Sequence, residues 1–575
     1  MRKLFPFLKD YKLQLIIGPI CKLLEAVFEL IIPLIMASII DKGIVNGDTD
    51  YIIKMGGVMI LLGAVGLCST LVCQKSAAIT SQGFGTKLRN ALFHHIGKLS
   101  FKELDKIGTP SLITRMTNDI NQLQIAVAML IRLVIRAPFL VIGAMIMAFS
   151  INHILSIIFI VASLLIAIIL YLVMSKSVPF FNRIQKRLDK ISLITRENLS
   201  GNRVIRAFDK QKEDEKRFND TTQDLTKQYL RVGKLSALLN PATFLVTNFA
   251  IVLIVWFGAG FVNTGDMHSG EIIALVNYMT QILLALIVVA NLVVIFTKAY
   301  ASGLRVSEVL QIEPSIVEGN IATTTSKTGV PKLEFKNVNF RYGGENVLHD
   351  INLKIETGQT IGVIGTTGSG KSSLVNLLPR FYDTSSGEVL FDGENVKNLT
   401  FKYLRGSFGI VPQNAVLFSG KISDNMRWGK KDATKEEIIK ALETAQALDF
   451  VNTLPLKTET RLVQGGKNLS GGQKQRLTIA RALVSSPSIL ILDDSASALD
   501  FATDAKLRSS IKKDIKNSTV IIVSQRVATV RSSDKIAVLE NGYLKGFDTH
   551  ENLFKNCKAY KEICLSQLSE KEVQD

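Results

Sequence analysis

The first 300 residues contain six long apolar stretches, whereas the remainder alternates apolar and polar positions in the manner of a soluble domain. A helix needs about 20 residues to cross a bilayer, and each stretch is long enough. The predicted spans are residues 14–40, 53–74, 126–150, 154–174, 238–262 and 272–297. Short loops (41–52, 151–153, 263–271) alternate with two long, polar, helix-prone ones (75–125, 175–237). The pattern predicts an all-α membrane domain with six transmembrane helices and long extensions.

The basic residues predict how these helices are oriented. The three short loops contain a single Lys or Arg, Lys42, whereas Lys176–Lys234 alone carries fifteen. Basic residues are concentrated on the cytoplasmic side of membrane proteins. We therefore expect a multi-pass protein of the cell (cytoplasmic) membrane, in contact with membrane lipids, with both termini and both long loops cytoplasmic.

The net charge of +18 could indicate a nucleic-acid partner. Much of the basic surplus flanks the apolar stretches, however, where it is typical of membrane topology. We therefore predict no nucleic-acid partner. The mean hydropathy of +0.26 alongside 21% charged residues agrees with apolar and charged residues being segregated along the chain. The five cysteines have no metal-ligand spacing and indicate buried or reduced thiols.

Polar residues within the spans leave two interpretations open. Arg132 and Arg136 lie at the start of the third span, where a charge in hydrocarbon is costly and often functional. Both are also near the inner end, where arginine can reach the headgroups. The last two spans contain further polar residues that either line a pathway or bond neighbouring helices: Asn240, Asn248, Asn277, Tyr278, Gln281 and Asn291.

The chain divides into a membrane domain (1–305), a linker (306–331) that includes the run Thr323–Ser326, and a soluble domain (332–575) that opens on alternating strand-like residues. Within the long loops, 109–120 and 201–209 mix apolar and polar residues. Each is either a docking element or ordinary amphipathic helix surface.

A phosphate-binding motif follows a short apolar strand in the soluble domain. Residues 365–372 read G-T-T-G-S-G-K-S, which is the P-loop pattern between a predicted strand and helix. Its glycines let backbone N–H groups curl around phosphates, Lys371 reaches the terminal phosphates, and the Ser372 hydroxyl binds Mg²⁺. The predicted nucleotide-binding residues are Gly365, Thr366, Thr367, Gly368, Ser369, Gly370, Lys371, Ser372 and Ser373. The soluble domain is therefore predicted to be an α/β P-loop domain that binds a nucleoside triphosphate.

Two further motifs accompany the P-loop. The apolar strand 489–492 leads into Asp493, where a carboxylate can hold Mg²⁺ beside the phosphates. Between the two lies a second cluster of backbone amides, Leu469, Ser470, Gly471, Gly472 and Gln473. Alone, its Ser-Gly pair could simply cap a helix.

In this order the motifs resemble those of the ABC transporter family, specifically exporters with six spans followed by a nucleotide-binding domain, over nearly the whole chain. The resemblance implies that Tyr342 stacks on the adenine of ATP and that Gln413, with Ser372 and Asp493, meets Mg²⁺. It implies that Ser497 and Asp500 belong to a loop at a dimer interface. It also implies that 109–120 and 201–209 are coupling helices, and that each ATP lies between one chain's P-loop and the partner's LSGGQ.

Two catalytic positions depart from the family pattern. In the family, the residue after the aspartate that ends the apolar strand is normally a Glu, which acts as the general base. Here that residue is Asp494, whose side chain is one methylene shorter. A misplacement of about 1 Å can cost about a hundredfold in rate. The family also places a His after a later apolar strand, and here that position is Gln525. The chain thus resembles the degenerate-site, non-catalytic subunit of bacterial heterodimeric multidrug exporters, whose LSGGQ serves a competent partner.

Several alternatives stay open. In a homodimeric lipid or drug flippase, both ATP sites would have Asp494 and Gln525 in place of Glu and His. An ATP-gated membrane regulator would use ATP binding without transport. A soluble DNA-repair ATPase is excluded by the six spans. The apolar spans favour a hydrophobic or amphipathic small-molecule substrate, and the multidrug role is implied by the resemblance alone.

Overall fold

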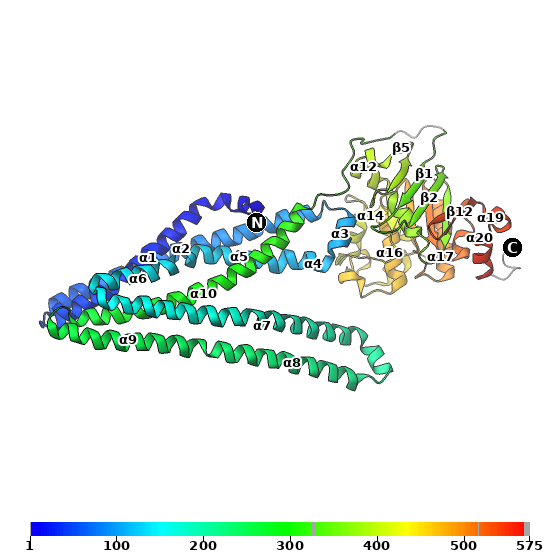
Figure 1. Cartoon of the computed structure of the whole chain (residues 1–575). Coiled ribbons are helices and arrows are strands. Elements are labelled where there is room, and N and C mark those ends of the chain that lie inside the picture. The colour runs from blue at the N-terminus through cyan, green and yellow to red at the C-terminus, as the bar shows by residue number, and fades with distance from the viewer. Residues whose placement is uncertain (1, 325–328, 496, 516, 568–575) are drawn as a thin grey trace. The chain divides into compact units, whose positions relative to one another are not determined.

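The computed structural model describes residues 2–324, 329–495, 497–515 and 517–567, and they form two compact units (Figure 1). The membrane unit comprises residues 1–97 and 108–312. The ATP-binding unit comprises residues 98–107 and 313–575.

The membrane unit is helical throughout. Its helices are α1 (Lys12–Ser38), α2 (Thr49–Ile96), α4 (Thr109–Thr114), α5 (Ile120–Met129), α6 (Arg136–Ile151), α7 (His153–Ala207), α8 (Gln211–Ala237), α9 (Leu239–Thr264) and α10 (Ser269–Gln311). A 3₁₀ helix, Arg2–Tyr11, precedes α1, and π-helical turns at Ile39–Ile44, Arg115–Asp119 and Leu130–Val134 continue or join neighbouring helices. Six stretches of the described chain are long and apolar enough to cross a membrane, which confirms the six predicted spans.

The long polar loops are helical extensions of the spans. Helix α7 continues for 55 residues and turns back at Asp209 into α8, so that the two form an antiparallel pair (Figure 1). Ion pairs of 3.0 Å join Arg187 to Asp224 and Arg217 to Glu197 across this pair. Exposed pairs of this kind contribute little to stability. Helix α7 continues through Pro179 in its interior.

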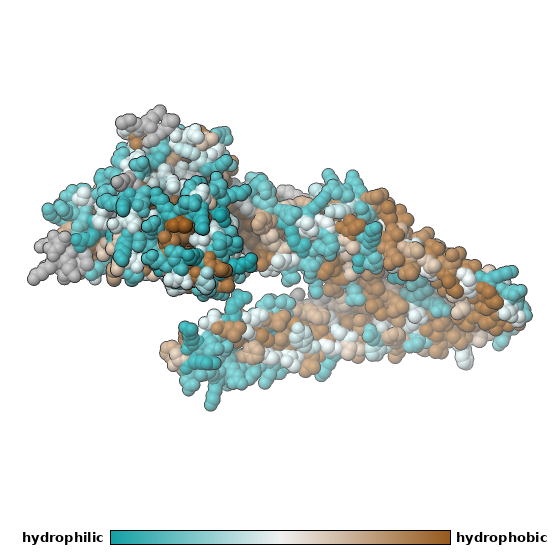
Figure 2. All heavy atoms as spheres, turned by 180° about the vertical axis from the view of Figure 1, so that it is seen from behind, coloured by the Kyte–Doolittle hydropathy of each residue, from teal (hydrophilic) through white to brown (hydrophobic). Residues whose placement is uncertain are grey.

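The surface of the membrane unit agrees with insertion into lipid. Figure 2 shows a broad apolar surface over its helices, with hydrophilic residues toward their ends. Large apolar side chains such as Ile60 (77% exposed), Leu245 (69%) and Trp256 (75%) point outward. Contiguous exposed apolar area of this extent is rare on soluble proteins.

Helix α10 lies at the centre of the membrane unit. Tyr278 is fully buried and donates a 2.6 Å hydrogen bond to the backbone oxygen of Leu30 in α1. Gln281 donates to the oxygen of Glu29 at 3.2 Å, whereas Asn277 bonds Ile273 within its own helix. Two of the polar residues predicted in the last span therefore join helices.

The ATP-binding unit is built on a mixed ten-stranded sheet with the order β5-β4-β1-β2-β12-β11-β3-β10-β9-β6. Its strands are β1 (Leu333–Phe340), β2 (Leu348–Ile355), β3 (Thr360–Gly365), β4 (Ser386–Phe391), β5 (Glu394–Asn395), β6 (Phe408–Val411), β9 (Ile489–Asp493), β10 (Thr519–Ser524), β11 (Lys535–Glu540) and β12 (Tyr543–Asp548). A separate pair is β7 (Gly420–Lys421) and β8 (Arg461–Leu462). Strands β6, β9, β10, β3 and β11 are parallel, which brings their carboxyl ends to one edge.

The helices of this unit are α3 (Phe101–Ile107), α11 (Lys371–Leu377), α12 (Phe401–Gly406), α13 (Ile422–Arg427), α14 (Lys435–Thr444), α15 (Leu448–Thr453), α16 (Gly471–Leu483), α17 (Phe501–Asp514), α18 (Val527–Val530), α19 (His550–Asn556) and α20 (Lys558–Leu565). Buried aliphatic residues of the parallel strands alternate between two apolar clusters, so that the core covers both faces of the sheet. The predicted α/β P-loop domain is confirmed.

Helix α3 belongs to the ATP-binding unit although it comes from the first long loop. The Phe101 ring lies 4.9 Å from that of Phe381, and Asp105 accepts a 2.6 Å hydrogen bond from Tyr382. Gly108, with a left-handed φ of 79°, separates α3 from α4. This contact precedes the 109–120 segment along the chain. That the 109–120 segment is itself a coupling helix stays a prediction.

The first residues of the predicted linker are helical. Helix α10 continues to Gln311 because Val306 and Val309 are fully buried, so residues 306–311 are helical rather than extended. Of the Thr323–Ser326 run, residues 325 and 326 lie outside the described residues.

Candidate ATP site

The P-loop lies at the carboxyl end of β3, between β10 and β11. Gly368 and Gly370 adopt left-handed φ values of 82° and 95°, which only glycine tolerates easily. A Cβ on Gly365 would lie 2.1 Å from the backbone oxygen of Leu539, so this position also requires glycine. The sharp turn that results leads directly into α11, whose first residue is Lys371.

Lys371 is held over the loop. Its Nζ donates to the backbone oxygens of Gly365 at 2.9 Å and Thr366 at 2.7 Å. Burial lowers the pKa of Lys371, against the opposing influence of Asp494 and Asp493. The ammonium group is thus placed at the mouth of the loop, where phosphate oxygens would bind.

Asp493 and Ser372 lie side by side. The Ser372 hydroxyl donates to Asp493 Oδ1 at 3.1 Å. Burial raises the pKa of Asp493, the Ser372 hydrogen bond lowers it, and the neighbouring Asp494 raises it again. The described residues contain no group of three His, Cys, Asp or Glu that could hold a metal. One carboxylate and one hydroxyl nevertheless fit Mg²⁺, which takes few protein ligands and relies on phosphates and water.

Asp494 is the predicted general base. Its backbone is left-handed, with φ 45°, and its amide donates to the oxygen of Val523 at 2.9 Å. Gln413 Nε2 lies 3.4 Å from Asp494 Oδ2, a long hydrogen bond. Burial raises the pKa of Asp494, and Lys371 and Arg526 oppose that shift. The structure therefore brings Gln413 and Asp494, two residues with separate predicted roles, close together.

Gln525 follows β10 and faces the P-loop. Its Oε1 accepts a hydrogen bond from Thr367 Oγ1 at 3.2 Å. Its backbone oxygen accepts from Gln567 Nε2 at 2.7 Å, and Gln567 Oε1 accepts from the amide of Val527 at 2.9 Å. Gln567 thus supports the Gln525 segment from near the C-terminus, and no sequence motif marks it.

Tyr342 is 45% exposed and packs edge-on against Tyr382, with ring centroids 5.1 Å apart at 88°. Its hydroxyl lies 3.0 Å from Ser373 Oγ at the start of α11. Tyr382 in turn bonds Asp105, and its pKa is raised by burial first and by that carboxylate second. Tyr382 and Asp105 were missed by sequence reasoning because they belong to no motif and lie 277 residues apart.

The LSGGQ segment begins α16 as a capping box. Ser470 Oγ accepts from the amide of Gln473 at 3.3 Å, and Gln473 Oε1 accepts from the amide of Ser470 at 2.9 Å. A Cβ on Gly471 would meet nothing within 4 Å, so this glycine is not required by packing inside the chain. Among the described residues, no hydrogen bond joins this segment to the P-loop.

The loop after Asp494 contains the predicted interface residues. Ser497 Oγ donates to the backbone oxygen of Asp494 at 2.8 Å, and Asp500 caps α17 by accepting from the amide of Thr503 at 2.9 Å. The loop therefore connects the general-base position to the start of α17.

Comparison with known proteins agrees with this geometry. The family described as ABC transporter transmembrane region matches residues 15–286, and the one described as ABC transporter matches residues 348–497. The chain belongs to the ABC transporter family. Its P-loop, LSGGQ and β9 motifs lie in the ATP-binding unit, and its six spans form the membrane unit, so it is a half-transporter.

Relatives of this transporter match along nearly their whole length. An uncharacterised ABC transporter ATP-binding protein of Mycobacterium tuberculosis is 37% identical over 559 residues, covering 95% of this chain and 94% of the relative. The uncharacterised YfiB of Bacillus subtilis is 37% identical over 570 residues, covering 99% and 98%. The fold matches a bacterial Atm1-family ABC exporter with ATP bound, with a TM-score of 0.79 at 22% identity over 97% of this chain and 99% of that one.

This half-transporter therefore binds ATP, and its ABC domain implies ATP hydrolysis that drives transport. It has the architecture of an exporter subunit with a multi-pass membrane domain. Half-transporters dimerise, because two ATP-binding domains are needed to complete a site.

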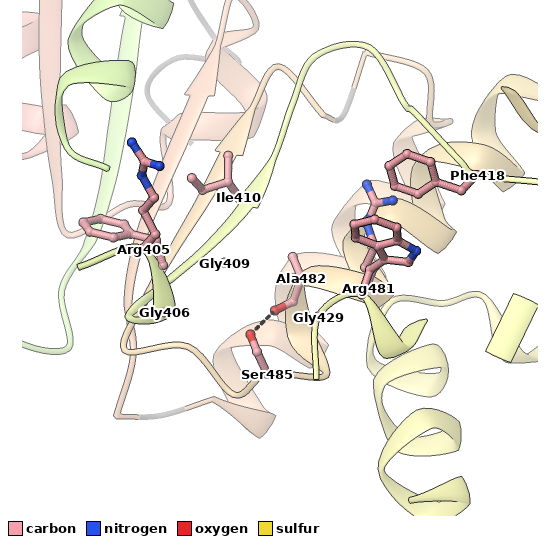
Figure 3. A pocket seen from close by; sticks show the side chains of 11 residues that line it. Arg405, Gly406, Gly409, Ile410, Phe418, Gly429, Arg481, Ala482 and Ser485 are labelled. Carbon is pink, nitrogen blue, oxygen red and sulfur yellow. Dashed lines mark hydrogen bonds between the residues drawn. The ribbon is translucent and has the colours of Figure 1, made fainter. Parts of the chain in front are cut away.

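The ATP-binding unit of the transporter also contains a pocket of about 310 Å³ away from the P-loop. Figure 3 shows Phe418 and Arg481 on one side of it and Arg405 and Ile410 on the other. Phe418 stacks on Trp428, with ring centroids 4.4 Å apart, and Trp428 is 68% exposed. Burial lowers the pKa of both arginines, a sign that their charges are partly desolvated. The pocket thus combines exposed aromatic rings with cationic groups.

Proposed function

We propose that this chain is one subunit of a heterodimeric ABC exporter that moves hydrophobic or amphipathic compounds out of the cytoplasm or the inner leaflet. Its own P-loop site binds ATP and hydrolyses it slowly, and its LSGGQ segment completes the active site of a competent partner. The observation that carries the proposal is the contrast between an intact P-loop and the two catalytic positions beside it, Asp494 and Gln525.

The residues around the P-loop support separate roles in this proposal. Lys371 binds the terminal phosphates, Tyr342 supports the adenine, and Mg²⁺ is held by Ser372, Asp493 and Gln413. Gln525 can donate or accept a hydrogen bond but, unlike histidine, cannot carry a positive charge toward the γ-phosphate. Asp494 has the right charge but the shorter reach. ATP would therefore be retained longer at this site than at a site with Glu and His.

We propose the membrane topology that the basic residues predict, with both termini and the α7–α8 extension in the cytoplasm. ATP binding would then close the paired domains, and the coupling helices would convert that closure into an outward-facing cavity. A homodimeric lipid or drug flippase and an ATP-gated membrane regulator are the competing functions.

Purification of the tagged chain from its native membranes in mild detergent tests the heterodimer. We expect a second ABC half-transporter in about equal amount, and its sequence should have Glu and His at the two positions that are Asp494 and Gln525 here. Recovery of this chain paired only with itself would overturn the heterodimer. Transport assays with reconstituted vesicles then separate a slow homodimeric flippase, which moves its substrate, from a regulator, which does not.

We further propose that the 201–209 segment is a coupling helix that docks on the ATP-binding domain of the partner subunit, in a pocket of the same kind as the aromatic pocket of this chain. Phe208 is 72% exposed at the tip of the α7–α8 extension and is followed by Asp209. An aromatic ring followed by a carboxylate complements a pocket with exposed aromatic rings and two arginines. This fit supports 201–209 as a coupling helix.

Replacing Phe208 with the photo-crosslinking residue p-benzoylphenylalanine tests the docking in the purified complex. Mass spectrometry should place the crosslink in the segment of the partner subunit that matches residues 405–429. The same replacement at Phe218, a partly exposed phenylalanine on α8, serves as the control and should not crosslink there. Crosslinks from position 208 only to lipid or to other segments would contradict the proposal.

A further inference from the structure

The membrane unit contains a cluster of five charged side chains among apolar helices. Three lie on α1 (Lys22, Glu25 and Glu29), Arg132 lies in the π-helical turn Leu130–Val134, and Arg136 begins α6. Lys22 is 8% exposed. Ionisable groups inside membrane helices are costly to bury and are retained where they pair or bind.

Both carboxylates of the cluster are already paired. Lys22 Nζ lies 2.6 Å from Glu25, and Arg136 Nη2 lies 2.6 Å from Glu29. Glu25 also accepts a hydrogen bond from Thr70 of α2. These contacts tie α1 to α2 and α6, and they account for two of the three cationic groups.

Arg132 is the cation that remains. It makes no hydrogen bond or ion pair within the described chain, and its buried Nε has no hydrogen-bond partner. The preceding residue, Ile131, packs against Gly18 of α1, and its backbone oxygen lies 4.0 Å from Sγ of the buried Cys73 of α2. Arg132 therefore lies where α1 and α2 meet, as do Lys22 and Glu25, and belongs to the same cluster. The cluster therefore holds three cations against two carboxylates.

The charged cluster contains further polar atoms that lack a hydrogen bond. Arg136 Nε is buried without a hydrogen-bond partner, although it lies 4.0 Å from Glu25 Oε1. Oε1 of Gln281, whose Nε2 bonds the backbone of Glu29, is likewise buried without a partner. Buried polar groups are nearly always hydrogen-bonded, so an exception needs a physical explanation. The turn that carries Arg132 is π-helical, a distortion that is frequent at functional sites.

We propose that Arg132, assisted by Arg136, binds the acidic group of an amphipathic anion, a compound with an apolar body and a carboxylate, sulfonate or phosphate. A guanidinium can bind such a group through two parallel hydrogen bonds, which supplies the partner that Arg132 lacks. The Arg136–Glu29 ion pair and the hydrogen bond from Thr70 to Glu25 hold together the helices around Arg132. This inference specifies the substrate class of the proposed exporter. Anion binding at Arg132 does not depend on the proposed function, whereas a role of this binding in transport does.

Equilibrium binding tests the site without requiring hydrolysis, transport or a particular dimer. The purified full-length complex is placed in phosphatidylcholine nanodiscs, and empty nanodiscs provide the background. The probes are 1-pyrenebutyrate and 1-pyrenebutyltrimethylammonium, which share an apolar body and differ in charge. We expect the complex to prefer the anion, and Arg132→Gln to weaken anion binding about tenfold or more while leaving cation binding unchanged.

Two further variants sharpen this test. Arg132→Lys keeps the charge and should retain most of the preference for the anion. Lys54→Gln removes one exposed positive charge near the N-terminal end of α2 and should leave binding unchanged. Equal binding of the two probes by the unmodified complex, or unchanged anion binding by Arg132→Gln, would overturn the proposal.

Adding phosphatidylglycerol to the nanodiscs identifies the source of the anion. Competition with pyrenebutyrate would assign the site to an anionic lipid headgroup. Unchanged pyrenebutyrate binding would assign it to a free amphipathic anion. Because ATP turnover is not measured, failure of the heterodimer proposal would leave these results intact.

Discussion

The double substitution Asp494→Glu with Gln525→His should raise ATP hydrolysis at this chain's own P-loop by about a hundredfold. Glutamate restores the methylene that brings the general base toward the attacking water. Histidine at position 525 still lies beside Thr367, which now bonds Gln525 at 3.2 Å, and it adds a group that can carry positive charge near the phosphates. The measurement is phosphate release per complex under saturating ATP.

The controls isolate this site. Adding Lys371→Ala to the double variant should remove the gained activity, because Lys371 is the cation held over the P-loop. ATP binding by the double variant itself, followed with a fluorescent analogue, should stay unchanged. Normal binding without any gain in turnover would reject Asp494 and Gln525 as the cause of slow hydrolysis.

Gly471→Asp should reduce ATP hydrolysis by the dimeric complex by at least about a hundredfold. Within the chain a Cβ at Gly471 meets nothing within 4 Å, so the subunit should fold normally. In the dimer the new carboxylate would face the phosphates of the ATP bound to the partner's P-loop. A like charge there opposes both ATP binding and closure of the two domains.

The control for this prediction is Lys435→Gln, which changes the charge by the same amount on the exposed first turn of α14. It should leave turnover and melting temperature unchanged. Thermal unfolding of Gly471→Asp should match that of the unmodified complex. Near-normal hydrolysis by a correctly folded Gly471→Asp complex would show that this LSGGQ segment does not complete the working site.

The cluster around Arg132 shows where sequence and tertiary structure divide. The sequence already marks Arg132 and Arg136 as unusual charges, but it equally allows both to reach the headgroups. The fold separates them, because Glu29 of α1 pairs with Arg136 and no carboxylate of the described chain pairs with Arg132. Pairing between distant helices depends on packing, which a linear pattern does not encode.

The six spans and the α/β ATP-binding unit could be predicted from the sequence alone. Bilayer thickness requires long apolar runs, and phosphate binding requires glycines at set spacing, so both requirements are local and readable. The tertiary structure decided which distant groups meet: Gln413 with Asp494, Thr367 with Gln525, and Tyr382 with Asp105. The first two contacts arise because parallel strands end at a common edge of the sheet. The contact of Tyr382 with Asp105 arises because α3 packs against residues that are far from it in sequence. No local pattern specifies such encounters, since they depend on how the whole chain folds.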